Sequence, residues 1–203
     1  MSSTSIQAKM FKAVSANTAA VAALQTTAGA ADFNLTSSSV SDGSNMATTV
    51  TLTSAGNISG VNFTITGTDE NGDAVSETRA GPNANTVATT EAFLTVTGVS
   101  VDAAVGTNTS VGFSATSTTK GIVFAGATRV RGMHGVSNAS TAGAMIIRNT
   151  SHSGDKRLEL DAPAAAGMID PYIPDEGIRY PNGAYIDISS GFDSVTVFFD
   201  GSY

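Results

Sequence analysis

The alternation of hydrophobic and polar residues is clearest at residues 61–66, where every second side chain is apolar. This period of two predicts a strand over residues 61–68 with one buried and one solvent-facing side. A second alternating run follows at residues 74–79. Asn71 and Gly72 stand between the runs, and both residue types tolerate a positive φ. The pattern therefore predicts a β-hairpin closed by a tight type I′ turn.

Short β-like runs recur along most of the chain, separated by Gly and Asn at the spacing of a β-sandwich. The first series comprises residues 33–36, 48–54, 61–68, 74–79, 93–101 and 110–115, and the second comprises residues 122–124, 128–133, 144–149, 157–160, 178–180, 185–188 and 195–199. Residues 114–121 contain no large apolar side chain, which predicts a boundary between two modules.

Residues 1–31 have a different composition, because alanine is dense from Ala13 to Ala31. Met10, Val14, Val21 and Leu24 are spaced as a helix permits, but the Ser, Thr and Asn residues among them favour helices only weakly. We predict an extended arm or a short helix here, which reaches a neighbouring subunit. The predicted fold is all-β: this arm at residues 1–31, a β-sandwich-like module at 32–115, a linker at 116–121, and a second module, sandwich-like or jelly-roll-like, at 122–203.

The composition indicates a folded chain with a neutral surface. The chain has 203 residues, of which 41% are hydrophobic, and this is enough for one substantial core or two small ones. Only 13% of the residues are charged, so Ser, Thr and Asn must supply the polar surface. The absence of cysteine excludes disulfides and thiolate metal sites, and stability must come from packing and assembly.

The charge and hydropathy of the chain bear on its partners. The net charge is −7 and no run of Lys or Arg occurs, so binding along a nucleic-acid backbone is not expected. The N-terminus lacks the pattern of a signal peptide, and no apolar run approaches the roughly 20 residues that span a bilayer. We expect no membrane partner and a product that stays in the cytoplasm of the cell that makes it.

One segment resembles a pattern common in structural proteins of tailed bacteriophages. The segment reads ITGTDENGDAVSETRAGPN, and the phage pattern has the form ItGTDxxGxxxsExxxGPN. The resemblance covers residues 46–113, and Arg79 stands where the pattern has a small or β-branched residue. A second segment, IDPYIPDEGIRYPNGAYIDISSGFDSVTVFF, is similar to the C-terminal end of small virion proteins of marine phages and cyanophages. The residues that match the first pattern are Gly67, Asp69, Gly72, Glu77, Gly81, Pro82 and Asn83.

These resemblances imply a non-enzymatic virion protein that needs no cofactor and assembles in the host cytoplasm. The role they imply first is decoration or cementing of the head shell, by a homo-oligomer bound to the major capsid protein or to other virion proteins. A trimer would suit a three-fold lattice site. Two alternatives stay open, namely a tail, neck or fibre component and a carbohydrate-binding receptor module.

The final 41 residues hold four of the five prolines and all four tyrosines. Proline stiffens loops, and tyrosine supplies broad contact area with a polar tip, which is a combination suited to interfaces. Upstream of them, Arg129 and Arg131 alternate around Val130, which predicts an exposed or inter-subunit strand face. We place the predicted assembly interface in the C-terminal segment, at Tyr172, Ile173, Ile178, Tyr180 and Tyr185.

Two patterns suggest chemistry, and each has a simpler explanation. Asp69, Asn71 and Asp73 have the alternate spacing of calcium ligands, but DENGD is also an ordinary hairpin tip, which we favour. His134 and His152 are the only histidines, and Asp155 lies near His152 in the sequence. A catalytic base also needs a positioned nucleophile, and no nucleophile elbow occurs, so catalysis is not expected.

Overall fold

The computed structural model describes residues 5–12, 15–38, 40, 44–115, 120–174 and 176–201. Within these ranges no helix occurs, and all pairings between strands are antiparallel. The chain divides into two compact units: unit 1 comprises residues 1–13, 44–46 and 119–203, and unit 2 comprises residues 14–43 and 47–118. Each unit contains two sheets and one hydrophobic core. The predicted all-β, sandwich-like fold is confirmed.

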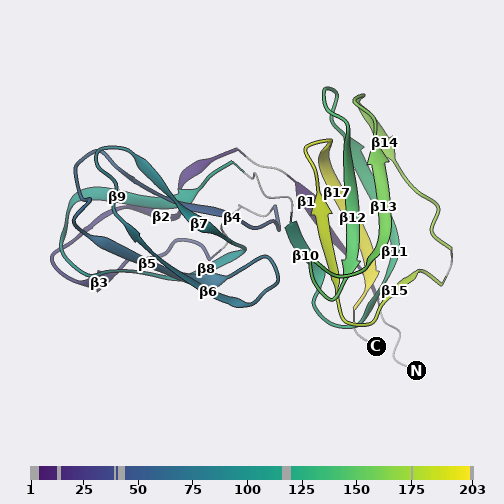
Figure 1. Cartoon of the computed structure of the whole chain (residues 1–203), viewed down its shortest axis with the longest axis horizontal. Coiled ribbons are helices and arrows are strands. Elements are labelled where there is room, and N and C mark those ends of the chain that lie inside the picture. Colours follow the sequence, from purple (N-terminus) through teal and green to yellow (C-terminus); the bar gives the residue numbers. More distant parts are fainter. Residues whose placement is uncertain are drawn as a thin grey trace. The chain divides into compact units, whose positions relative to one another are not determined.

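Unit 2 packs two four-stranded sheets around an aromatic and aliphatic core (Figure 1). Phe63, Ile65, Leu52, Phe93 and Phe113 are among its largest fully buried side chains. One sheet has the order β2 (Asn17–Thr27), β9 (Val105–Phe113), β4 (Thr48–Ser54) and β7 (Thr86–Phe93). The other has the order β3 (Ala31–Asp32), β8 (Thr95–Val101), β5 (Asn62–Thr68) and β6 (Ala74–Ala80).

Unit 1 is built in the same way, with Phe11, Met145, Ile147, Tyr180 and Ile186 fully buried in its core. One sheet has the order β1 (Ile6–Lys12), β17 (Phe192–Asp200), β11 (Thr128–Ser137) and β14 (Gly167–Ile169), and β15 (Ile178–Tyr180) also pairs with β11. The other has the order β10 (Lys120–Phe124), β16 (Ala184–Ile188), β12 (Gly143–Asn149) and β13 (Lys156–Ala162).

The predicted N-terminal arm or helix is wrong, because the first 31 residues contribute strands to both units. β1 pairs with β17 over seven residues and buries Phe11 in unit 1. β2 pairs with β9 and buries Val21 in unit 2. A Cβ atom on Gly112 of β9 would lie 1.9 Å from the backbone oxygen of Asn17, so the alanine-rich strand packs very close to its neighbour. Tertiary packing thus overrides the helix propensity of alanine.

The boundaries between the units differ from the predicted ones for the same reason. The chain begins in unit 1, enters unit 2 after residue 13, returns for residues 44–46, and leaves unit 2 finally after residue 118. Of the predicted linker at 116–121, residues 116–119 lie outside the described ranges. Lys120 and Gly121 already belong to β10.

The predicted hairpin is confirmed, but its turn differs from type I′. β5 and β6 pair in register from Asn62 with Ala80 to Thr68 with Ala74. Of the turn residues only Gly72 has a positive φ, of 86°. The carboxylate of Asp69 accepts the backbone N–H groups of Asn71 and Asp73 at 2.8 and 2.9 Å. These two hydrogen bonds stabilise a loop that is longer than two residues. A type I′ turn would need two residues with positive φ, whereas this loop has only Gly72.

Other residues of the phage-like pattern also have roles in the folding of unit 2. A Cβ on Gly67 would lie 1.9 Å from the backbone oxygen of Thr95, and one on Gly81 would lie 2.5 Å from that of Ile58, so only glycine fits at either position. Glu77 of β6 accepts backbone N–H groups from Thr90 and Glu91 of β7, at 2.8–3.0 Å. The pattern therefore marks structural positions.

Candidate functional site

The structure brings only one of the five predicted interface residues fully to the surface. The side chain of Tyr172 is 85% exposed. Ile173 and Ile178 are half-buried and pack against the core of unit 1. Tyr180 is buried in the core of unit 1, whereas Tyr185 lies on the opposite face of β16 from the core residue Ile186 and is buried against the His152 ring, with 5.5 Å between the ring centroids. The two buried tyrosines stabilise unit 1 itself, and a partner cannot reach them.

The exposed hydrophobic side chains gather instead on one side of a sheet in unit 1. We call the solvent-facing side of sheet β1-β17-β11-β14 the outer face. The opposite side of this sheet packs into the core through Phe11, Val130, Val195 and Val197, all fully buried. Four of the six large exposed hydrophobic residues in the described ranges are on the outer face: Ile6, Met10, Met168 and Phe198.

The register of the strands places the outer-face residues in rows across the sheet. Residues that lie directly opposite each other in an antiparallel pair project from the same face and are in contact. From one end of the outer face to the other, the rows are Ile6, Asp200, Arg129 and Arg179; Ala8, Phe198 and Gly132; Met10, Thr196 and His134; and Lys12, Ser194, Val136 and Met168.

The apolar part of the outer face centres on Phe198. Its neighbours are Ala8 on one side and Gly132 on the other, and a Cβ on Gly132 would lie 3.6 Å from the Phe198 ring. Ile6 and Met10 flank Ala8 along β1 and project in the same direction. These four apolar side chains on two adjacent strands form one contiguous group. A contiguous exposed apolar group is a candidate interaction surface.

A histidine and a carboxylate are paired on the same outer face. Nδ1 of His134 lies 2.7 Å from Oδ1 of Asp170, and both side chains are accessible to solvent. The pair stands in the row of Met10 and Thr196, so it borders the apolar group. The pair offers hydrogen-bonding groups beside apolar area.

The row at the end of the outer face is charged. Arg129 of β11 lies directly opposite Arg179 of β15, and both line a hollow of about 240 Å³ with Ala127 and Thr128. The guanidinium of Arg129 donates to the backbone oxygen of Glu176 at 2.7 Å and lies 3.5 Å from its carboxylate.

Two further arginines stand close to this row. Arg157 donates to the backbone oxygen of Arg179 at 3.2 Å. Arg131 pairs with Asp200 at 2.7 Å, and Asp200 is only 2% exposed. As the sequence predicts, Arg129 and Arg131 are partly exposed while Val130 is buried.

The second histidine takes part in a separate, partly buried network. His152 hydrogen bonds through Nδ1 to Asp187, and not to Asp155 as its place in the sequence suggests. Arg148 donates to the other oxygen of Asp187 at 2.9 Å. Burial raises the pKa of Asp187, but the hydrogen bonds from His152 and Arg148 outweigh burial and hold this pKa below its usual range. The network joins β12, β16 and the turn that follows β12, and so it stabilises this part of unit 1.

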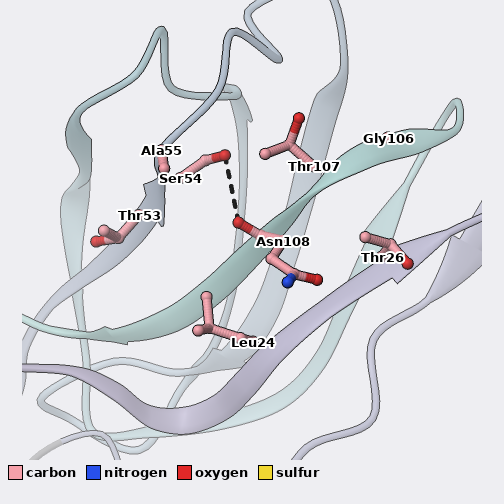
Figure 2. Close-up of a pocket in the computed structure, with 8 residues that line it drawn as sticks. All are labelled: Leu24, Thr26, Thr53, Ser54, Ala55, Gly106, Thr107 and Asn108. Atoms are coloured by element: carbon pink, nitrogen blue, oxygen red, sulfur yellow. Dashed lines mark hydrogen bonds between the residues drawn. The ribbon is translucent and has the colours of Figure 1, made fainter.

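Unit 2 carries a larger hollow, of about 600 Å³, on three neighbouring strands (Figure 2). Leu24 and Thr26 come from β2, Thr107 and Asn108 from β9, and Thr53 and Ser54 from β4, and the remaining lining residues are Ala55 and Gly106. The hollow contains hydroxyl and amide groups around one exposed leucine, without a titratable side chain. It could fit a small apolar group, but it offers no group for acid–base chemistry.

In the part of the chain that the structure describes, no three His, Asp or Glu side chains come together as metal ligands. At the DENGD tip, the carboxylate of Asp69 is engaged by backbone N–H groups. The described residues also include no helix that could span a membrane. Comparison of the chain with protein-family models, with curated proteins and with solved structures gives no significant match.

Proposed function

We propose that this chain is a non-enzymatic structural protein of a tailed-bacteriophage virion, which decorates the head shell as a homo-oligomer. The phage-like pattern at residues 65–83 and the C-terminal resemblance motivate the virion role. The observation that carries the assembly role is the contiguous apolar group of Ile6, Ala8, Met10 and Phe198 on the outer face. Water contact with this group is unfavourable, and a partner that covers it gains roughly 25 cal/mol per Å² of apolar area.

The edges of the sheets favour docking through a face over uncontrolled strand pairing. Edge strands with open backbone groups invite aggregation unless charge or a covering segment blocks them. The edge strand β13 carries four charged residues among its seven. The edge of β2 is covered at Val21, whose backbone oxygen accepts the N–H groups of Thr36 and Ser37. At these two edges, docking through a face is favoured over strand pairing.

Decoration of a shell by this chain would depend on where its two sandwiches contact the lattice and on how many copies bind. Two rigid sandwiches in one chain can contact different subunits of a lattice, and many weak contacts then add through multivalency. The same properties would serve a tail, neck or fibre component, and the location within the virion decides between these roles. The carbohydrate-binding alternative loses its main support, because it depends on exposed tyrosines, and Tyr180 and Tyr185 are buried.

The proposal is tested on purified virions of the phage that encodes this chain. We expect the chain among the virion proteins in mass spectrometry, in a copy number set by the lattice, with an antibody label on the head in electron micrographs. An antibody label on the tail would favour the role of a tail component instead. If purified virions lack the chain, the virion role is wrong.

A further inference from the structure

The charges of the chain are divided unequally between its two units. Unit 2 contains a single cation, Arg79, and eight acidic residues, which gives it a formal charge of −7. Unit 1 contains nine cations and nine acidic residues, and its formal charge is zero. The net charge of the whole protein is therefore that of unit 2. A basic surface on unit 1 of one copy would attract unit 2 of another copy.

The arginine row of the outer face is such a basic surface. Arg129 lies between Asp200 of β17 and Arg179 of β15, and like charges directly opposite on neighbouring strands are destabilising, so an anion bound beside Arg179 would be favourable. Glu176 already places a carboxylate oxygen 3.5 Å from the guanidinium of Arg129. The Glu176 side chain is 89% exposed, so solvent weakens this ion pair. Within the described residues no carboxylate pairs with the guanidinium of Arg179. Two guanidinium groups beside a hollow are a fitting receptor for carboxylates.

Unit 2 offers carboxylates in a rigid setting at the tip of the β5–β6 hairpin. Asp69, Glu70 and Asp73 lie within five residues there, and Asp73 is exposed. Asp69 holds the loop through its two hydrogen bonds to backbone N–H groups, so the tip is preorganised. A rigid tip loses little conformational entropy on binding.

We propose that the arginine row of unit 1, Arg129 with Arg179, binds the hairpin tip of unit 2 in a second copy, through Glu70 and Asp73. The adjoining apolar group then covers part of the same partner. This inference rests on the assembly role proposed above and specifies its geometry. The contact is heterologous, because two different surfaces meet, and it generates a closed ring or an open filament depending on the rotation between copies.

The test uses two full-length variants that each lose one side of the contact. The face variant carries Arg129→Gln and Arg179→Gln, and the hairpin variant carries Glu70→Gln and Asp73→Asn. These substitutions remove charge and keep side-chain size. Circular dichroism and urea unfolding first establish that both variants fold like the wild type. A matched control, Glu91→Gln on β7, removes an exposed carboxylate outside the hairpin tip.

Sedimentation velocity then measures association in 50 mM NaCl. We expect the wild type and the control to associate, and each variant alone to associate at least tenfold more weakly. An equimolar mixture of the two variants should form a 1:1 complex that grows no further, because each brings the side that the other lacks. Added NaCl should dissociate the complex, since exposed charges are screened.

Three results would overturn the head-to-tail contact. The first is a wild type that stays monomeric, and the second is a pair of variants that associate like the wild type. The third is a mixture that stays monomeric when both variants are monomers, because the intact face of one variant should bind the intact hairpin of the other. None of these results removes the chain from purified virions, so the virion role is judged separately.

Discussion

At the scale of single residues, buried polar groups decide where unit 1 gains and loses stability. Tyr180 is fully buried, and its hydroxyl has no hydrogen-bond partner among the described residues. Burial also raises the pKa of Tyr180, so the group stays neutral. A buried hydroxyl without a partner costs free energy. The Tyr180 ring therefore stabilises unit 1 through apolar packing, while its hydroxyl destabilises it.

Replacing Tyr180 by phenylalanine should therefore stabilise the protein. Tyr180→Phe keeps the ring and removes the unsatisfied hydroxyl, and we expect the free energy of unfolding to rise by about 1 kcal/mol. Urea unfolding followed by circular dichroism measures the change. Tyr172→Phe is the control, because Tyr172 is exposed and its hydroxyl should be neutral in this assay. A loss of stability in Tyr180→Phe would mean that the hydroxyl has a favourable contact.

The lowered pKa of Asp187 predicts a dependence of stability on pH. A carboxyl whose pKa is lower in the folded state than in the unfolded state stabilises the fold above the unfolded pKa, about 3.9, and this contribution is lost as the pH falls through the folded pKa. Asp187→Asn should reduce the free energy of unfolding by about 2 kcal/mol at pH 7. The difference from wild type should shrink below pH 4.

Urea unfolding at pH 7, 5 and 3 measures this dependence. Asp155→Asn serves as the control, since Asp155 is exposed and pairs with no cation in the described residues. A difference between wild type and Asp187→Asn that is the same at pH 3 and pH 7 would contradict the role given to the ionised carboxylate.

Residue-scale contacts were only partly predictable from the sequence. The hairpin tip was found because its residues are neighbours in the chain and turn chemistry is local. Asp155 lies near His152 in the sequence, but the structure pairs His152 with Asp187, which is 35 positions away. The burial of Tyr180 could not be predicted, because the strand Ile178–Tyr180 has only three residues and is too short to show an alternation of apolar and polar residues.

At the scale of elements, the two sheets of unit 2 are joined at an open edge by one side chain. β6 and β7 are edge strands of different sheets. The carboxylate of Glu77 on β6 accepts N–H groups of Thr90 and Glu91 on β7, which would otherwise face solvent at the edge. Glu77 thus joins the sheets and also blocks this part of the edge from pairing with another chain.

Removing this carboxylate should weaken unit 2. Glu77→Ala takes away three charge-assisted hydrogen-bond contacts, and we expect the free energy of unfolding to fall by about 2 kcal/mol. Glu91→Ala is the control, because the Glu91 side chain is exposed on the adjoining strand. Hydrogen exchange of the Thr90 and Glu91 amides gives a local measurement. Unchanged protection of both amides in Glu77→Ala would contradict this role.

The strands that were missed at this scale lie at the N-terminus. Ile6, Ala8 and Met10 alternate with polar residues, which is a strand signal. The density of alanine downstream instead favours a helix or an arm. Propensity is local, whereas the pairing of β1 with β17 joins residues almost 200 positions apart. The apolar group of the outer face could not be predicted, because three of its four residues, Ile6, Ala8 and Met10, lie on β1.

At the scale of the whole molecule, we propose that copies of the chain assemble through the outer face of unit 1. The resemblance to virion proteins suggests assembly. Two of the predicted interface residues, Tyr180 and Tyr185, are buried, and aromatic content in a sequence alone does not separate core from surface. The arrangement of Phe198 beside Ala8, Ile6 and Met10 depends on strand register, which only the structure gives.

The most direct test of this account is the oligomeric state of the full chain with a changed outer face. Sedimentation velocity should show an oligomer for the wild type and a folded monomer for Phe198→Asp with Met10→Asp, because two carboxylates in the apolar group oppose its burial. Leu24→Asp, at the exposed leucine of unit 2, should leave the oligomer intact. A wild type that stays monomeric at all concentrations, or a double variant that sediments like the wild type, would contradict assembly through the outer face.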